Sequence, residues 1–360
     1  MLGLHKNHPT AYFDGARGIA VLFVWLSHTS GRGQGMADWL SFHGIGHVGV
    51  MFFFVLSGFL LSMPFNKARS FSVSAYLIRR FLRIAPLYYL VVTGVYIYQI
   101  QTGQLHDRYL HLYDGFTGYL QHLLFLKGDG IFWTIPAEFM FYLILPLIAL
   151  FLLKQQAWRY AIIISLALAY GFYHFLIIAN IIQLPSLMIA EIKKHSQYFD
   201  VFIIGLIFGM LTNNIVIKAY YLANKRILDV LIFSVFITTI FATLAFVSSQ
   251  FLFFEQPFYF VRFLSFMYAL AFGAALYSAF MGNQYLKLVF CFRPLIFMGV
   301  VGYSWYLLHM PVVQYSNYIG LSGIAGFIIS TLAMVLICTV TYFSIEEPFI
   351  RLGKRFSKNR

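Results

Sequence analysis

Three ionisable side chains that could form an acid–base site lie within strongly apolar stretches of the chain. His28 lies in FDGARGIAVLFVWLSHT, Glu138 in FWTIPAEFMFYLILP, and His309 in GYSWYLLHMPVV. A histidine oriented by a carboxylate is a common general base, because imidazole titrates near neutral pH. We therefore predict that His28 and Glu138 are catalytic and that His309 contacts substrate. Trp133 and Tyr303, in the same segments as Glu138 and His309, are further candidate substrate contacts.

An arginine shares the predicted helical face of His28. Arg17 precedes His28 by eleven residues, which is three helical turns plus about 20°, or about 16 Å along the axis. Ionisable groups at membrane depth normally face the interior of a helix bundle or a wet cavity. We therefore predict that Arg17 is functional, with Asp14 as a further catalytic candidate. The alternative is that Arg17 reaches the membrane interface and His28 hydrogen-bonds a carbonyl.

A second cluster of charge lies in the segment YLIRRFLRIAP, which contains Arg79, Arg80 and Arg83. Guanidinium groups bind phosphate in a bidentate manner, although arginines at this place could also serve only as topological anchors. A phosphate-binding cluster on the inner side and an acid–base cluster on the outer side suit a reaction between a cytoplasmic, phosphate-bearing donor and an outer acceptor. His43 and His47 have i, i+4 spacing but no third ligand nearby, so we predict no metal ion.

The elements that must position these residues are membrane helices. Of the 360 residues, 61% are hydrophobic and 10% are charged, whereas soluble domains are about 25% charged. A membrane span needs about 20 mostly apolar residues. Ten such spans are predicted, at residues 13–30, 44–64, 83–101, 130–153, 159–179, 197–213, 228–249, 262–282, 297–318 and 323–344. We thus expect an all-α, polytopic integral membrane protein.

The distribution of basic residues predicts the orientation of these helices. With the N-terminus in the cytoplasm, 19 of the 25 Lys and Arg residues fall on the inner side, as the positive-inside rule requires. Both termini are then cytoplasmic, and the net charge of +13 reflects topology and contact with membrane lipid rather than nucleic-acid binding. The chain stops soon after the last span, so we expect a single membrane domain over residues 1–360 without an appended extracytoplasmic domain.

Six segments, in order from residue 13 to 351, resemble motifs of the membrane acyltransferase-3 family. They are FDGARGIAVLFVWLSH, GHVGVMFFFVLSGFLL, RRFLRIAPLYY, FWTIPAEFMFYLILP, GYSWYLLHMPVV and SIEEPFIR. The resemblance implies a bacterial inner-membrane O-acyltransferase that moves acetyl from cytoplasmic acetyl-CoA to hydroxyls of surface glycans, such as lipopolysaccharide O-antigen or peptidoglycan. It also implies that Arg17 and His28 are essential, that the arginines of the third motif contact CoA, and that Glu138 is a functional acid.

Two departures from the family pattern affect the expected mechanism. Met51 stands where the second motif often has an acid. Some members carry an extracytoplasmic esterase-like domain, so this chain would either complete the transfer or pass acyl groups to a separate periplasmic partner.

We expect His28 to act as a general base on a sugar hydroxyl or as a transient acyl carrier. The alternative function is a transporter or flippase, but the paired inverted halves typical of transporters are not evident in the sequence.

Overall fold

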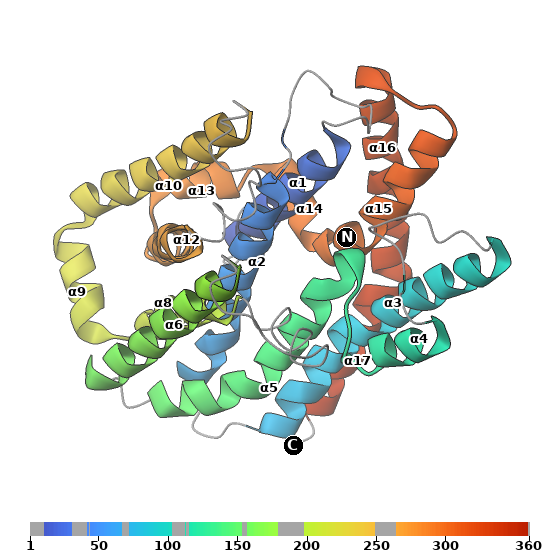
Figure 1. Ribbon diagram of the computed structural model, residues 1–360. Helices are drawn as coiled ribbons and strands as arrows, with labels where there is room; N and C mark the ends of the chain where they lie inside the picture. The colour runs from blue at the N-terminus through green and yellow to red at the C-terminus, as the bar shows by residue number, and fades with distance from the viewer. Residues whose placement is uncertain are drawn as a thin grey trace.

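The computed structural model describes residues 11–30, 42, 44–66, 72–102, 112, 115–152, 157–178, 198–248 and 264–358. Within these residues every regular element is helical, which confirms the predicted fold class (Figure 1). The elements are α1 (Ala11–Thr29), α2 (Ile45–Ser62), η1 (Met63–Asn66), α3 (Val73–Thr102), α4 (Gly115–Leu123), η2 (Gly130–Trp133), α5 (Thr134–Leu152), α6 (Ala157–Ile178), α8 (Phe199–Leu211), α9 (Ile215–Ala223), α10 (Lys225–Ser248), α12 (Ser265–Phe280), α13 (Gln284–Phe290), α14 (Arg293–Val300), α15 (Gly302–Tyr318), α16 (Gly323–Thr341), the π-helical turn η3 (Tyr342–Glu346) and α17 (Glu347–Lys358).

The described helices support a multi-span membrane protein, with fewer clear spans than the ten predicted. Five helices are long and apolar enough to cross a membrane, or up to eight if each bent pair forms one span. The bent pairs are α8 with α9, α12 with α13, and α14 with α15, which meet at 80°, 102° and 82°. The two predicted spans outside this set correspond to α1, which carries Asp14, Arg17 and His28, and to α6. The cytoplasmic location of both termini stays a prediction.

Glycines allow α1 to touch its neighbours backbone to backbone. A Cβ atom added to Gly15 would lie 1.6 Å from the carbonyl oxygen of Phe290, and one added to Gly18 would lie 1.9 Å from that of Leu295. From the other side, a Cβ on Gly299 would lie 1.7 Å from the Asp14 carbonyl oxygen. Small residues are the usual means of close helix packing in membranes, where burial of apolar surface gives little driving force. This packing holds α13 and α14 around the first half of α1.

A second glycine contact joins α2 to α8 in the middle of the bundle (Figure 1). A Cβ on Gly58 would lie 2.2 Å from the Phe202 carbonyl oxygen, and one on Gly205 would lie 2.1 Å from that of Val55. Because α2 also packs against α1 and α12, it forms the centre around which the other helices are placed.

Helix α15 runs beside α1 in the same direction. Three successive contacts along the two helices show this. A Cβ on Gly302 would lie 3.0 Å from Val21, and further along the rings of Trp25 and Trp305 meet edge to face with centroids 5.9 Å apart. Further still, the ring centroids of His28 and His309 lie 5.0 Å apart. The first and the penultimate motifs are therefore adjacent along their lengths.

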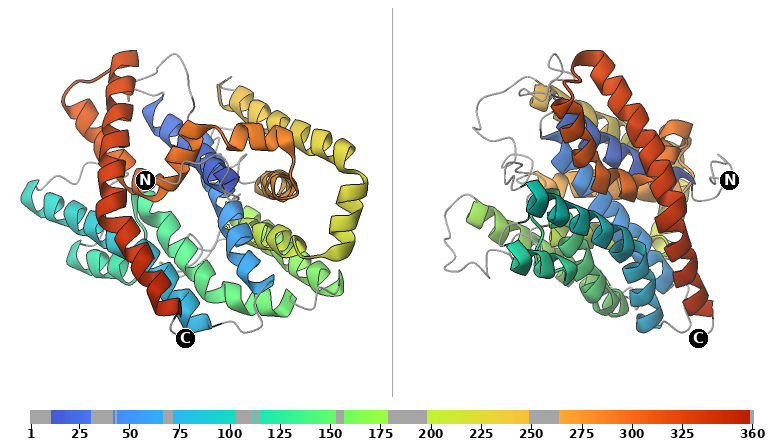
Figure 2. Two further views of the ribbon diagram at one scale, coloured as in Figure 1. Left: turned by 180° about the vertical axis from the view of Figure 1, so that it is seen from behind. Right: turned by 90° about the vertical axis from the view of Figure 1, so that its right-hand side faces the viewer.

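The C-terminal helices flank the bundle at the start of α3. Helices α16, η3 and α17 follow one another as a long rod, and α17 lies beside α3 (Figure 2). The π-helical turn η3 inserts one extra residue into the helical repeat, a feature that is frequent at functional sites. It carries Glu346, which is buried.

Candidate active site

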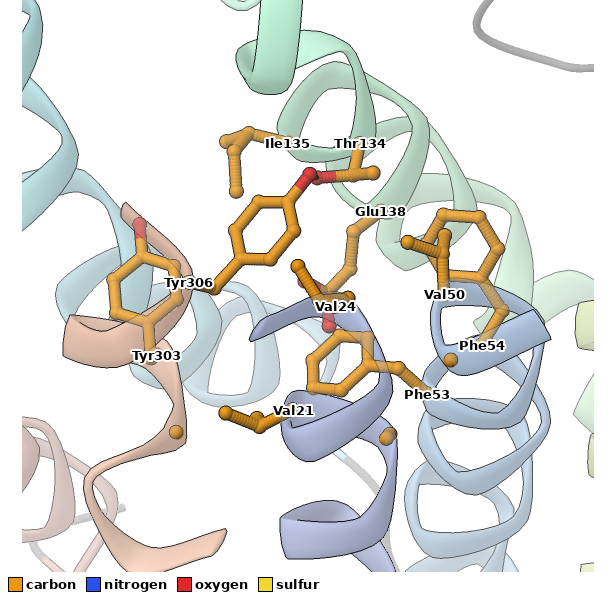
Figure 3. Close-up of a pocket in the computed structure, with 13 residues that line it drawn as sticks. Val21, Val24, Val50, Phe53, Phe54, Thr134, Ile135, Glu138, Tyr303 and Tyr306 are labelled. Atoms are coloured by element: carbon orange, nitrogen blue, oxygen red, sulfur yellow. Dashed lines mark hydrogen bonds between the residues drawn. The ribbon is translucent and has the colours of Figure 1, made fainter. Parts of the chain in front are cut away.

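A pocket lies between α1, α2, α5 and α15, and two of the residues predicted from the sequence, Glu138 and Tyr303, line it. It encloses about 440 Å³ of space, including its open mouth. Most of its wall is apolar, as Figure 3 shows, and comes from Ala20, Val21, Val24, Gly49, Val50, Phe53, Phe54, Ile135 and Gly302. The polar groups of the lining are Thr134, Glu138, Tyr303 and Tyr306. A mostly apolar cavity with a few placed polar groups is the usual form of a small-molecule site.

Arg17 lies at one end of this pocket, one helical turn before Val21. Its Nη1 donates to Asp14 Oδ1 at 2.8 Å and to the Gly299 carbonyl oxygen at 3.4 Å. The side chain also lies against Gly302, whose added Cβ would be 3.5 Å from Arg17 Cδ. The Arg17 side chain is only 13% exposed, so Asp14 and the carbonyl hold the guanidinium in one place.

His28 and His309 lie beyond the opposite end of the pocket. His28 follows the lining residue Val24 by four residues, and His309 follows Tyr306 by three, so each histidine is one helical turn further along its helix. The ring centroids are 5.0 Å apart. The structure therefore brings together two of the three predicted acid–base residues.

Glu138 lies in a hydrogen-bond network near the arginines of α3. Its carboxylate accepts hydrogen bonds from the Ser57 hydroxyl, at 3.2 Å, and from the Tyr142 hydroxyl. Helix α5 runs opposite to α15: Thr134 donates to the Tyr306 hydroxyl at 2.9 Å, so Glu138, one turn later on α5, lies toward Tyr303. The Glu138 carboxylate is thus bonded to one hydroxyl from α2 and one from α5.

Two of the three arginines on α3 face the buried site. Arg80 and Arg83 both interact electrostatically with Glu138. The Arg80 guanidinium lies over the rings of Tyr76 and Tyr142, at 5.8 and 6.0 Å from their centroids, and its Nε has no hydrogen-bond partner. A buried donor without a partner is unusual in a folded protein and suits an anionic ligand.

Arg79 has a different surrounding from the other two arginines. A Cβ added to Gly353 of α17 would lie 3.4 Å from the Arg79 Cα atom. The backbone of α3 at Arg79 therefore packs against the C-terminal helix rather than against the pocket.

Glu346 belongs to the site although sequence reasoning gave it no role. It accepts hydrogen bonds from the Ser304 backbone N–H, at 2.9 Å, and from the Ser304 hydroxyl, at the beginning of α15. It also interacts electrostatically with Arg83 and Arg17. The motif SIEEPFIR was the available signal, but the sequence did not show that it folds back onto the arginines. Glu138 and Glu346 together offset the positive charge of the partly buried arginines.

Comparison with known proteins identifies the family. The acyltransferase-3 family model, described as an acyltransferase domain, matches residues 10–343. The chain belongs to the acyltransferase-3 family. A similar curated protein is the peptidoglycan O-acetyltransferase OatA of Listeria monocytogenes serovar 1/2a, with 23% identity over 370 residues. The alignment covers 94% of this chain and 56% of OatA, so the chain spans about half the length of that relative. No solved structure matches the chain with significance.

The remaining predicted residues of this acyltransferase-3 member have structural contacts of their own. The Tyr303 hydroxyl donates to the Ile84 carbonyl oxygen at 2.8 Å while its ring lines the pocket. Trp133 packs against Phe54 and Tyr198, with centroids 6.0 and 5.5 Å away. Tyr306 was not among the residues predicted from the sequence; its hydroxyl donates to the Ile131 carbonyl oxygen at 2.6 Å.

In the part of the chain that the structure describes, no three His, Cys, Asp or Glu side chains form a metal-binding group; His43 lies outside that part.

For an acyltransferase, this arrangement offers three chemical environments, one after another along the pocket. Guanidinium groups at one end suit an anion, the apolar middle suits an uncharged chain, and the imidazoles beyond the other end can accept a proton or an acyl group. Because the parallel helices α1 and α15 carry residues at both ends, the relative positions of these environments are fixed by helix packing.

Proposed function

We propose that the chain is a membrane O-acetyltransferase that moves an acetyl group from cytoplasmic acetyl-CoA to a hydroxyl of an extracytoplasmic surface glycan. The observation that carries this proposal is the apolar pocket with Arg17 at one end and the histidine pair beyond the other. A site of this form can receive a donor whose charged part stays with the arginines while its uncharged arm extends toward the histidines.

The donor would be bound mainly through its phosphates. Arg80 and Arg83 offer guanidinium groups beside the pocket, and the unpartnered Nε of Arg80 would gain an acceptor. Arg79, which packs toward α17, would contribute at the edge of this cluster. The pantetheine arm would then pass Arg17 and lie along the apolar wall formed by Val21 and Val24, which brings the thioester toward His28.

The chemistry proposed at His28 is acyl transfer. As a general base, the imidazole takes the proton of the sugar hydroxyl, the oxygen forms a bond to the acetyl carbonyl carbon, the C–S bond breaks, and the leaving thiolate receives the proton. As an acyl carrier, the ring nitrogen first forms the bond to the acetyl group and then releases it to the hydroxyl. In both cases Asp14 holds Arg17, and Glu138 and Glu346 keep the neighbouring arginines in a neutralised cluster.

The acceptor is proposed from the family and from the similar protein. The relative OatA is named for action on peptidoglycan, and surface polysaccharides such as lipopolysaccharide O-antigen present comparable hydroxyls. We place the protein in a bacterial inner membrane with both termini in the cytoplasm, where acetyl-CoA is available on one side and glycan on the other. A separate periplasmic protein that receives acyl groups would be an additional partner.

The proposal is tested with the purified full chain in liposomes, labelled acetyl-CoA and crude surface glycan. Wild type is expected to release free thiol and to label the glycan, and His28→Ala is expected to do neither. A transporter or flippase would move donor or glycan across the bilayer without releasing thiol. Absence of thiol release by wild type, with glycan and periplasmic extract supplied, would refute the acetyltransferase proposal.

A further inference from the structure

His309 is buried in an environment that fixes its ring and leaves one nitrogen unused. Its Nδ1 lies 2.6 Å from the Tyr306 carbonyl oxygen, while its Nε2 has no hydrogen-bond partner; the residue is 0% exposed. A carbonyl oxygen can only accept, so Nδ1 carries the hydrogen and donates it. In the neutral ring, Nε2 then presents a lone pair with no donor to satisfy it.

A buried acceptor without a donor is costly unless a bound group supplies one. The other buried histidine of the described chain, His122, shows the satisfied arrangement: Nδ1 lies 2.8 Å from the Gly118 carbonyl oxygen and Nε2 accepts from the Asp129 backbone N–H at 3.0 Å. His309 lacks the second partner. Its free nitrogen therefore suits a donor that is present only during the reaction.

The place of His309 indicates what that donor is. The residue follows the pocket residue Tyr306 by one turn, and its ring lies 5.0 Å from that of His28. It is thus beside the proposed reacting centre, at the end of the pocket away from the arginines. The reacting group that carries a hydrogen and arrives from that end is the acceptor hydroxyl.

We propose that His309 is a second catalytic residue, whose Nε2 takes the proton of the acceptor hydroxyl, while His28 carries the acyl group. This inference rests on the proposed function and assigns separate half-reactions to the two histidines. The Tyr306 carbonyl oxygen would stabilise the ring as it becomes positively charged, because Nδ1–H already donates to it.

The two half-reactions balance. In the first, a nitrogen of His28 forms a bond to the acetyl carbon, the C–S bond breaks, and the proton displaced from the His28 ring goes to the CoA thiolate. In the second, Nε2 of His309 takes the hydroxyl proton, the acceptor oxygen forms a bond to the acetyl carbon, and the C–N bond to His28 breaks. His309 then returns the proton to His28, so that acetyl-CoA and alcohol have become free thiol and ester.

The test compares His309→Asn, His309→Gln and Met310→Leu in the full chain in liposomes. Asparagine can keep the hydrogen bond to the Tyr306 carbonyl while it removes the basic nitrogen, and Met310 is an adjacent buried residue that serves as a packing control. The assay follows a single turnover of labelled acetyl-CoA, recording thiol release and protein-bound label, and then steady-state transfer to crude surface glycan. Thermal melting of each purified variant reports folding.

The proposal expects His309→Asn to melt close to wild type, to retain the KM for acetyl-CoA, and to release one equivalent of thiol with label retained on the protein. Its maximal rate of transfer to glycan should fall about 10²–10⁴-fold, the usual contribution of a general base, while Met310→Leu keeps the wild-type rate. His309→Gln should behave like His309→Asn.

Three results would overturn the assignment of His309. They are transfer within tenfold of the Met310→Leu rate, a change confined to the glycan concentration needed for half-maximal rate, and loss of the melting transition in both His309 variants, which would give the residue a structural role. If wild type itself releases no thiol, the proposed function fails instead. An active wild type with active His309 variants refutes the present inference alone.

Discussion

Replacing Gly18 with alanine is expected to inactivate the enzyme by moving α14 away from α1. The added Cβ would lie 1.9 Å from the Leu295 carbonyl oxygen, whereas ordinary contact begins at 3.4 Å. The difference of 3.4 minus 1.9 Å requires the two backbones to separate by about 1.5 Å, because the obstacle is a main-chain atom and cannot rotate away. Overpacking of this kind costs about 1–3 kcal/mol of stability.

The catalytic effect should exceed the loss of stability. Gly18 is next to Arg17, and α14 supplies the Gly299 carbonyl that accepts from the Arg17 guanidinium at 3.4 Å. Helix α14 also leads into α15, which carries His309. A displacement of about 1 Å between reacting groups can reduce a rate about 10²-fold, so we expect at least that loss in transfer from labelled acetyl-CoA to surface glycan.

Gly94→Ala on α3 is the matched control. Gly94 also lies within a helix, but an added Cβ would meet nothing within 4 Å. Alanine there should leave the activity unchanged and stabilise the helix by about 0.5–1 kcal/mol. If Gly18→Ala retains wild-type activity and melting temperature, then α1 and α14 do not depend on backbone contact, and the packing argument is wrong.

Two further predictions concern charge. Glu346→Gln leaves the two Ser304 donors with a neutral acceptor in place of a carboxylate, so the free energy of unfolding should fall by about 1.5–3 kcal/mol. Glu347→Gln, in an exposed pair with a side-chain partner that is 70% exposed, should cost less than about 1 kcal/mol. Equal melting temperatures for the two variants would contradict this difference. Arg80→Lys should raise the KM for acetyl-CoA about tenfold, because an ammonium cannot replace a bidentate guanidinium at a buried site. Arg79→Lys should change that KM less, and the reverse order would argue against Arg80 as the donor contact.

The sequence alone determined the features that depend on composition and on a single helix. An excess of apolar residues with few charges requires membrane helices, and the six ordered motifs indicated the family that the family model then matched over residues 10–343. The spacing of Arg17 and His28 also needed no tertiary information: both lie in α1, and the geometry of an α-helix sets their separation and common face.

The bent helix pairs could not be predicted from apolar runs. Residues 297–318 were expected to form one span, but α14 ends at Val300 and α15 begins at Gly302 with a bend of 82°. Hydropathy measures how long an apolar run is, and it does not show whether the run continues straight through a turn. The direction after such a turn depends on which distant helix offers a complementary surface.

Only the tertiary structure decided which ionisable residues are neighbours. His28 and His309 meet because glycine contacts hold α14 against α1 and start α15 in parallel with it. Glu138 lies with Ser57, Tyr142 and the arginines of α3 because α5 runs in the opposite direction to α15. The sequence indicates how far along its own span each residue lies. It does not indicate which residues of other helices it contacts, because those contacts follow from how the helices pack. The partners of each charged group are therefore a property of the fold.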